Sequence, residues 1–231
     1  MRGVLPLRVG VDAGHVYTLS ERTTRGRITG VSALFAEGGL VVGSYARYDA
    51  NKPVDEAHQT HLAIVDPDTG DIQQIPHPPN HGVQRQAGSA AIGKRHIVWT
   101  ETPSIEMGAQ PWVMYAYDLR THRSTVLGHS HPVHGRPAQP PPNFSGLSFG
   151  HQTVVWAQVD PMRGGSRGVI MNLYGYDFAA EDPAPRLLVR NGFDPVNTPA
   201  ALFYLKANIS DPTMPRHVFE IHRRDWGTGK D

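Results

Sequence analysis

Cysteine is absent from this 231-residue chain, so neither disulfide bonds nor thiolate metal ligands can contribute to its fold or chemistry. An excess of charge of one sign is also missing, because 22 lysine and arginine residues face 21 aspartate and glutamate residues. No uniformly basic surface and no basic arm is therefore expected. We predict that nucleic acid is not a partner of this protein.

Long apolar runs are missing as well. No stretch of about 18 apolar residues occurs, so no transmembrane helix and no membrane partner is expected. The apolar run at the amino terminus is short, is broken by Pro6 and Arg8, and is followed by no small-residue cleavage site. These features predict a soluble, cytoplasmic protein, although a chain trimmed of its leader would have the same appearance.

Three segments of the chain repeat at a fixed interval. Leu40–Gly43, Ile97–Thr100 and Val154–Ala157 begin at positions 40, 97 and 154, so the repeat is 57 residues long. Each segment follows a strand of small residues, and each leads to a third apolar strand that ends in aspartate and then to a fourth strand. This order predicts a four-stranded antiparallel meander. Because one meander cannot bury both of its faces, the repeats must stack on one another.

A partial fourth copy is carried by Ala201–Leu205 and Val218–Arg223, and two more strands are expected at Leu5–Val11 and Val16–Leu19. We predict one all-β domain over residues 1–231, a small β-propeller of about four four-stranded blades. A strand from the N-terminus would close the ring and remove its exposed edge. The alternative is an open sheet whose edges are covered by a second subunit. The predicted units are residues 5–19, 30–76, 87–128, 144–189 and 200–225.

The predicted loops are long on one face of the propeller, where the second-to-third loops and the connections between blades emerge. Long loops on a rigid scaffold are where binding residues gather. The alternative interpretation is that these proline-rich segments are tolerated insertions. The segments are Ala46–Gln59, Thr102–Pro111, Val159–Gly168, Lys206–Arg216, His77–Gln86, His129–Asn143 and Arg190–Pro199.

Two glutamates in one of these segments are the candidate acid–base residues. Glu101 and Glu106 flank Pro103, and glutamate is not a residue that turn chemistry favours. A carboxylate near Trp99 and Trp112 would have its pKa raised by desolvation and could shuttle protons. The two tryptophans are also candidate substrate contacts.

Basic side chains nearby complete the candidate site. His96 directly precedes its strand and would assist proton transfer, while Arg85 would hold an anionic group and His81 would line the same site. The structural alternatives are that His96 is a satisfied structural residue, and that Trp99 packs between blades as its repeat equivalent Trp156 would.

Metal and cofactor sites are not predicted. The histidines of the segment 129–134 have no supporting acidic or cysteine ligand, and a solvated histidine loop explains the same residues. Glycine motifs for phosphate or dinucleotide binding are absent, as is the nucleophile elbow of hydrolases. We therefore expect metal-free chemistry without a cofactor.

The strand Ile97–Trp99 and the strand ends Tyr115–Asp118 and Tyr174–Asp177 resemble the repeats of TolB-like propellers, over roughly residues 30–225. These generic motifs imply a propeller fold. The families concerned include periplasmic binding modules, lyases and peptidase-associated domains, so the resemblance implies little about function.

A second, slighter resemblance concerns the bacterial Pictet–Spengler cyclases, which make β-carbolines from tryptophan and an aldehyde. His96 and Glu106, with His81 or Arg85 upstream, are similar to the glutamate, histidine and arginine on which that family relies. The resemblance implies a cytoplasmic homodimer and a condensation of an amine with an aldehyde.

Two classes of function follow from these observations. The first is a biosynthetic enzyme that uses metal-free acid–base chemistry on an aromatic or amino-acid-derived small molecule, with Glu106 or Glu101 as proton shuttle. The second is a non-catalytic propeller that binds a small ligand or a protein partner on its long-loop face. An enzyme should have a concave pocket with converging polar groups, whereas a binding module should have a flatter face.

Overall fold

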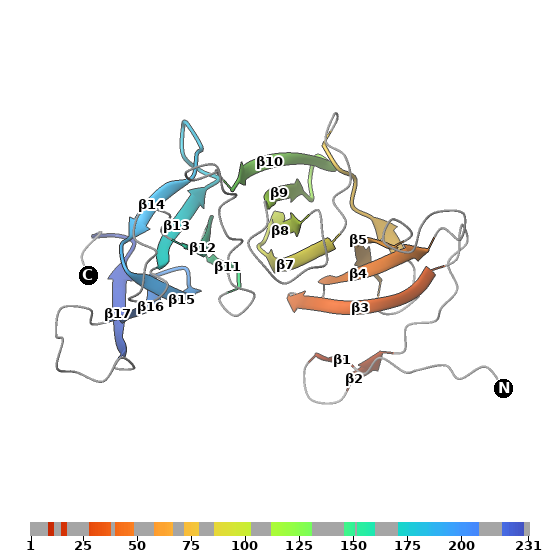
Figure 1. Cartoon of the computed structure of the whole chain (residues 1–231), viewed down its shortest axis with the longest axis horizontal. Helices are drawn as coiled ribbons and strands as arrows, with labels where there is room; N and C mark the ends of the chain where they lie inside the picture. Colours follow the sequence, from red (N-terminus) through yellow and green to blue (C-terminus); the bar gives the residue numbers. More distant parts are fainter. Residues whose placement is uncertain are drawn as a thin grey trace.

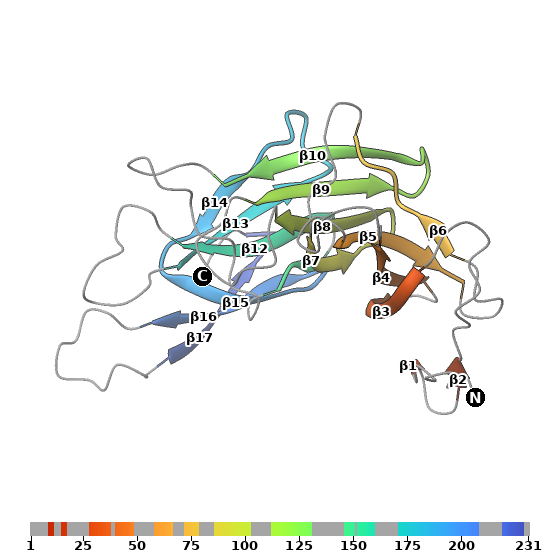
Figure 2. The same cartoon turned by 45° about the vertical axis from the view of Figure 1, so that its right-hand side comes forward.

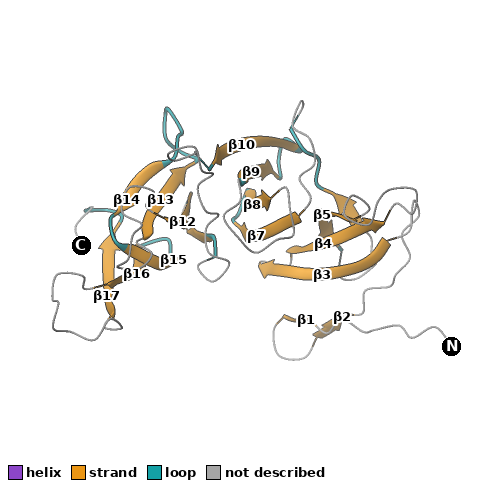
Figure 3. Cartoon of the chain, viewed as in Figure 1, coloured by secondary structure: helices purple, strands orange, loops and turns teal. Residues whose placement is uncertain are grey.

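Strands make up the regular structure of this protein, and the part of the chain that the structure describes contains no helix (Figure 3). The computed structural model describes residues 9–11, 15–17, 28–37, 40–48, 58–66, 72–78, 86–102, 112–130, 146–150, 152–159, 171–207 and 219–228. The strands are β1 (Val9–Val11), β2 (His15–Tyr17), β3 (Ile28–Glu37), β4 (Leu40–Tyr48), β5 (His58–Val65), β6 (Ile72–Gln74), β7 (Gln86–Ile92), β8 (His96–Thr102), β9 (Val113–Asp118), β10 (Arg123–His129), β11 (Ser148–Gly150), β12 (Thr153–Val159), β13 (Met171–Asp177), β14 (Arg186–Val189), β15 (Gly192–Asn197), β16 (Ala201–Ala207) and β17 (Phe219–Asp225).

Four antiparallel meanders follow one another along the chain, as the 57-residue repeat predicts. Blade 1 is β3-β4-β5-β6, blade 2 is β7-β8-β9-β10, blade 3 is β11-β12-β13-β14, and blade 4 is the three-stranded sheet β15-β16-β17. The blades are arranged in chain order along an arc, with blade 1 and blade 4 at its two ends (Figures 1 and 2). The all-β, propeller-like fold is therefore confirmed.

Apolar residues from facing blades form three core clusters, one at each junction between consecutive blades. Val42 of blade 1 packs with Trp99 of blade 2, Val98 of blade 2 packs with Trp156 of blade 3, and Val155 of blade 3 packs in one cluster with residues of blade 4. Because blades 2 and 3 are covered on both faces, their second strands are apolar without alternation, like the strands of other sheets buried on both sides. This explains the Ile-Val-Trp segment of the repeat.

The strand-ending aspartates of the repeat have a structural role. Oδ1 of Asp118 accepts the backbone N–H groups of Arg120 and Thr121 at 2.8 and 3.2 Å. In the next blade, Oδ1 of Asp177 accepts the N–H of Ala179 at 2.9 Å. An aspartate that bonds the backbone two residues further on stabilises a turn, and here it reverses the chain between the third and fourth strands.

The first strand of blade 4 differs from the sequence prediction, which placed a long connection at Arg190–Pro199. Residues Gly192–Asn197 form β15, although Pro195 lies within them. The pairing of β15 with β16 shifts between Phe193 and Val196, and Asp194 has a φ of 48°. A proline that cannot donate to a ladder is accommodated at such an irregularity, which is why the sequence pattern there looks like a loop.

Asn197, at the end of β15, joins blade 4 to blade 3. Its side-chain amide donates hydrogen bonds to the backbone oxygens of Thr153 at 2.8 Å and of Gly150 at 3.3 Å. Its Oδ1 accepts the indole N–H of Trp226 at 2.9 Å. One buried amide thus holds together two strands of blade 3 and the end of blade 4.

Closure of the ring by an N-terminal strand is not confirmed. The described N-terminal strands overlap the two predicted ones, and β1 pairs with β2 through Val9–Tyr17 and Val11–His15. Among the described strands, no ladder joins β17 to blade 1 or to the β1-β2 hairpin. The described chain is therefore an open arc, with its first and last blades at opposite ends (Figure 1).

Candidate functional site

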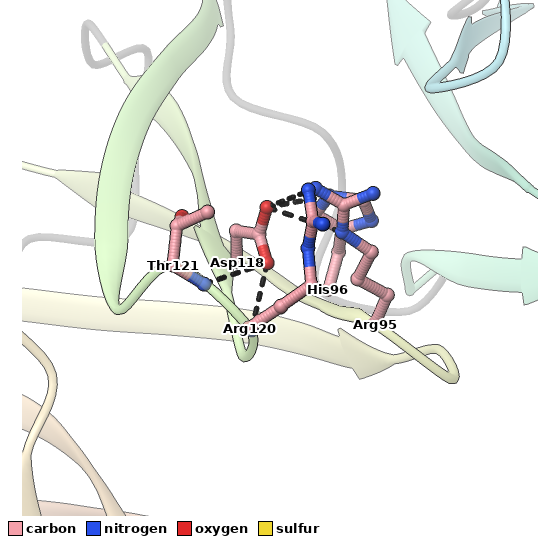
Figure 4. Close-up of polar contacts among 5 residues, drawn as sticks. All are labelled: Arg95, His96, Asp118, Arg120 and Thr121. Atoms are coloured by element: carbon pink, nitrogen blue, oxygen red, sulfur yellow. Dashed lines mark hydrogen bonds and ion pairs between the residues drawn. The ribbon is translucent and has the colours of Figure 1, made fainter.

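Two groups of interacting polar side chains lie on the two faces of blade 2. One surrounds Glu101, at the far end of β8 between blades 1 and 2. The other surrounds His96 and Asp118, at the start of β8 beside blade 3 (Figure 4). The sequence prediction placed Glu101 and His96 in one site, whereas the structure separates them into these two groups.

Glu101 lies within β8 and not in a loop, and its side chain is fully buried. Its Oε1 accepts the indole N–H of Trp99 at 2.8 Å. Nε2 of His77 lies 2.8 Å from Oε1 and 3.0 Å from Oε2 of the same carboxylate. Because a buried carboxylate must be matched by donors, these two rings explain how an acidic residue is tolerated in the core between blades 1 and 2.

Aromatic rings enclose this carboxylate. Trp99 stacks on Tyr115 with ring centroids 5.3 Å apart, and the ring of His77 meets both at its edge, 6.4 and 5.6 Å away. Burial, together with the negative charge of Glu101, raises the pKa of Tyr115 to about 12. Glu101 is thus enclosed by rings and bonded to two of them.

The second group lies at the end of blade 2 where the short turns are. Arg95 donates to Oδ2 of Asp118 from Nη2 and Nε, at 2.5 and 3.1 Å, and Nε2 of His96 lies 4.0 Å from the same oxygen (Figure 4). The Arg95 guanidinium, aided by the backbone donors of Arg120 and Thr121, holds the pKa of Asp118 well below its usual range. The carboxylate therefore stays charged well into the acid range.

The ring of His96 is largely buried, with 16% of its side chain exposed. Its ring stacks on Phe178 with centroids 4.0 Å apart and an interplanar angle of 13°. Burial lowers the pKa of His96 from its ordinary value, opposed by the negative charge of Asp118 and assisted by the positive charge of Arg95. Near neutral pH the imidazole is therefore uncharged and offers one donor and one acceptor.

A pocket of about 540 Å³ opens beside this group, between the outer strands of blade 2 and the end of β13. Its size falls within the usual range for small-molecule sites. Apart from Asp118, its charged side chain is that of Arg123, which is exposed. The lining residues are His96, Ala116, Asp118, Thr121, Arg123, Thr125, Tyr176 and Phe178.

The structure does not bring Glu101 and His96 together. They lie near opposite ends of β8, and because they are five positions apart, an odd number, their side chains point to opposite faces of the sheet. Along a strand this separation is roughly 16 Å. One small substrate cannot contact both groups, so the predicted pairing of a Glu101 proton shuttle with His96 does not form in this structure.

The remaining predicted residues divide into two sets. Trp99 and Trp112 are buried, but they belong to different core clusters, on opposite faces of blade 2. The packing role considered for Trp99 and Trp156 is confirmed, since their exposed fractions are 0% and 2%. Glu106, His81 and Arg85 lie outside the residues that the structure describes, so their roles remain predictions.

Sequence reasoning did not select the partners that matter in either group. His77 was only one of many histidines in the long segments, and nothing in its sequence context indicates that it contacts Glu101. The sequence does single out Asp118, because an aspartate recurs at the same strand end in each repeat. Nothing in the sequence singles out Tyr176 and Phe178, because the pocket forms only when blade 3 packs on blade 2.

Metal-ligating clusters are not found in the described part of the chain, where no group of three histidine, aspartate or glutamate side chains could hold an ion. Of the histidine segment 129–134, only the first two residues are described, and Nδ1 of His129 lies 3.2 Å from the backbone oxygen of Ser130. In the described residues no helix is long and apolar enough to cross a membrane.

No protein-family model matches the chain, and no curated protein sequence matches it. Several solved structures are similar to it. An acylaminoacyl peptidase in complex with Z-Gly-Gly-Phe-chloromethyl ketone superposes with a TM-score of 0.52 at 10% identity, over 84% of this chain and 32% of that one. The acylaminoacyl peptidase of Pyrococcus horikoshii gives 0.50 at 9% identity, over 86% and 32%. TolB from Acinetobacter baumannii gives 0.47 at 15% identity, over 87% and 42%.

The similarity is one of fold. At these identities a shared architecture does not transfer an activity. This chain spans less than half the length of these three structures. Together with the four meanders, the two superpositions with a TM-score of at least 0.50 support a generic propeller-like fold. None of the comparisons supports the resemblance to Pictet–Spengler cyclases.

Proposed function

We propose that this protein is a propeller-like module that binds a small carboxylate with an aromatic body in the pocket between blades 2 and 3. The observation that carries the proposal is the composition of that pocket, which combines one exposed guanidinium, Arg123, with an aromatic wall formed by Tyr176 and Phe178. Pockets of this kind, largely apolar with a few orienting polar groups, are typical of small-molecule sites.

The charges around the pocket favour an anion. Asp118 is neutralised by Arg95 and occupied by backbone donors, so it does not add an uncompensated negative charge. His96 is uncharged near neutral pH because burial lowers its pKa. The guanidinium of Arg123 therefore supplies the positive charge of the pocket, and guanidinium groups bind carboxylates through paired hydrogen bonds.

The rings favour a planar, apolar body for the ligand. Phe178 stacks on His96, and Tyr176 meets Phe178 at its edge, with centroids 4.9 Å apart and an interplanar angle of 61°. A flat ring laid against this wall would gain both contact area and the geometric preference of aromatic pairs. This ligand class agrees with the aromatic or amino-acid-derived compound expected from the sequence.

The proposal is tested by isothermal titration with benzoate and phenylacetate and with their neutral amides. The carboxylates should bind more tightly than the amides by roughly 10- to 100-fold, the range expected for a charge-assisted contact. Arg123→Gln should remove this preference, whereas Arg190→Gln, at an exposed site on blade 3, should preserve it. Equal affinity for acids and amides, or an unchanged preference in Arg123→Gln, would refute the proposal.

A second candidate, metal-free acid–base catalysis, is favoured by the contact between Glu101 and His77. A buried carboxylate that accepts from Nε2–H fixes the tautomer of the ring, and Nδ1 would then exchange protons. In this alternative, Glu101 is a positioning residue and His77 is the base. Incubation with amine–aldehyde pairs separates the two functions, since a binding module forms no condensation product.

A further inference from the structure

Blade 4 has an outer face that carries apolar side chains at positions the other blades bury. The strand-ending aspartates align the repeats, because Asp118, Asp177 and Asp225 pair with the first residue of the second strand of their own blades. The position four residues before this aspartate, or before Asp66 in blade 1, is therefore equivalent in every blade. Its occupants are Leu62, Met114, Leu173 and Ile221.

Burial at this position separates blade 4 from the others. The exposed fractions of Leu62, Met114 and Leu173 are 1%, 0% and 0%, whereas Ile221 is 78% exposed. In blades 1, 2 and 3 this side chain points toward the next blade along the chain and is covered by it. Ile221 thus has the chemistry of a blade-to-blade contact, and no blade among the described residues covers it.

Other apolar residues share this face. Ile221 pairs with Leu205 across β16 and β17, and Val196 pairs with Phe203 across β15 and β16. Directly opposed residues project on the same side of a sheet. Val196 and Phe219 are 58% and 46% exposed, so three of the four large exposed apolar side chains of the described residues lie in blade 4. A grouped apolar surface of this kind marks an interaction site.

The opposite face of blade 4 is already occupied. Leu202 and Tyr204, which alternate with Phe203 and Leu205 along β16, are buried against Leu173 of blade 3. The exposed face is therefore the continuation of a series of face-to-face contacts between blades, and a partner that packs on it should present a similar sheet face.

A second copy of this chain can pack on blade 4 only through a sheet face that is itself exposed. The face of blade 1 that points away from blade 2 carries Val41, Ala63 and Val65, whose exposed fractions are 4%, 1% and 2%. At these described positions the face is covered, so a head-to-tail contact between blade 4 of one copy and blade 1 of another would find no exposed apolar side chain there. The exposed face of blade 4 itself remains, and self-association through one shared patch closes after two copies.

The charges on the exposed face permit this contact. Arg223 is bonded to Asp225 on the same strand, with Nη2 2.7 Å and Nε 2.9 Å from Oδ1. The guanidinium of Arg223 also lies 5.9 Å from the ring centroid of Phe203. The pair is neutral as a whole, so two copies of the face can approach without like-charge repulsion.

We propose that the outer face of blade 4 packs against the same face of a second copy of this chain in a two-fold dimer. The inference does not depend on the ligand pocket, which lies between blades 2 and 3. It specifies the class of partner, a second copy of the same sheet face, and it places Ile221 at the centre of the contact.

The test is sedimentation velocity on the full chain over a range of concentrations, with Ile221→Lys as the decisive variant. The wild-type protein should reach a mass of twice 25.4 kDa, and Ile221→Lys should weaken the dimer at least 30-fold, as expected when a central apolar contact is replaced. The control Leu187→Lys changes a 39% exposed apolar residue of blade 3 and should sediment as wild type.

Folding is checked separately, since the 78% exposed Ile221 contributes little to the core. The far-ultraviolet spectrum of Ile221→Lys should match that of the wild type. A wild-type chain that remains monomeric at every concentration would overturn the proposal. A dimer that persists in both Ile221→Lys and Phe219→Lys, or an assembly that grows beyond two copies, would overturn it equally.

Discussion

Nε2 of His77 lies 2.8 Å from Oε1 of Glu101, and this contact joins the segment that leaves blade 1 to the second strand of blade 2. The carboxylate is fully buried and also accepts the indole N–H of Trp99. Removing it would leave two buried donors without their acceptor, which is costly. The acidic residue thus belongs to the packing between blades.

Glu101→Ala should therefore lower the free energy of unfolding by roughly 3 kcal/mol, the cost of two buried donors left unpaired. Urea denaturation measures the change. Glu220→Ala is the matched control, because its carboxylate is about half exposed and contacts His222 at 3.1 Å on the surface. Its loss should cost less than about 1 kcal/mol. Equal effects of the two substitutions would contradict the structural role of Glu101.

Asp118 should make stability fall in acid. Its pKa in the folded protein lies below the unfolded value of about 4, so its contribution is complete above pH 4 and is lost as the pH falls further. Asp118→Asn should therefore flatten the decline of stability below about pH 4. Thermal melts at successive pH values measure this, with Asp182→Asn, at an exposed turn position, as the control. An unchanged acid decline in Asp118→Asn would show that the Arg95 contact does not form in solution.

His96 should titrate below the ordinary histidine pKa of about 6.5, because the neighbouring blade desolvates its ring. Asp118→Asn should lower this pKa further, since the Asp118 charge is what opposes the shift. A bound carboxylate should raise the pKa, and by linkage the acid should then bind more tightly as the pH falls through it. Imidazole NMR titrations, with and without phenylacetate, measure both effects. No response to the acid would place its binding elsewhere.

Gly150 should not tolerate a side chain. A Cβ there would lie 2.6 Å from the backbone carbon and oxygen of Asn197, closer than packed atoms can approach. Gly150→Ala must therefore push blade 4 away from blade 3, at a cost of about 1–3 kcal/mol. Gly146→Ala is the control on the same blade, because nothing lies within 4 Å of its added Cβ. Comparable denaturation midpoints in the two variants would be inconsistent with the described contact.

The role of Glu106 as a general base stays a prediction from the sequence. If the long-loop face is an active site, Glu106→Gln should abolish turnover and leave the thermal midpoint nearly unchanged, since loss of a general base typically costs 10²–10⁴ in rate. A fully active Glu106→Gln variant would remove this residue from the mechanism. Arg85→Ala should instead weaken substrate binding.

The periodicity of the sequence determined the number, order and strand content of the blades. The repeat could be read because each blade needs the same buried positions, such as Leu62, Met114 and Leu173, and the same turn aspartate. The buried positions and the turn aspartate both depend on residues that lie close together in the sequence. The sequence did not predict β15, because Pro195 makes this segment look like a loop. Only its pairing with β16 shows that the segment is a strand.

Contacts between blades were decided by the tertiary structure alone. His77 and Glu101 are 24 residues apart, and His96 and Phe178 are 82 residues apart, so no spacing rule relates them. Strand periodicity states which residues share a face but not which blade covers it. Burial follows from that coverage, and for this reason Ile221 looks in the sequence like its buried equivalents while the fold leaves it exposed at the end of the arc.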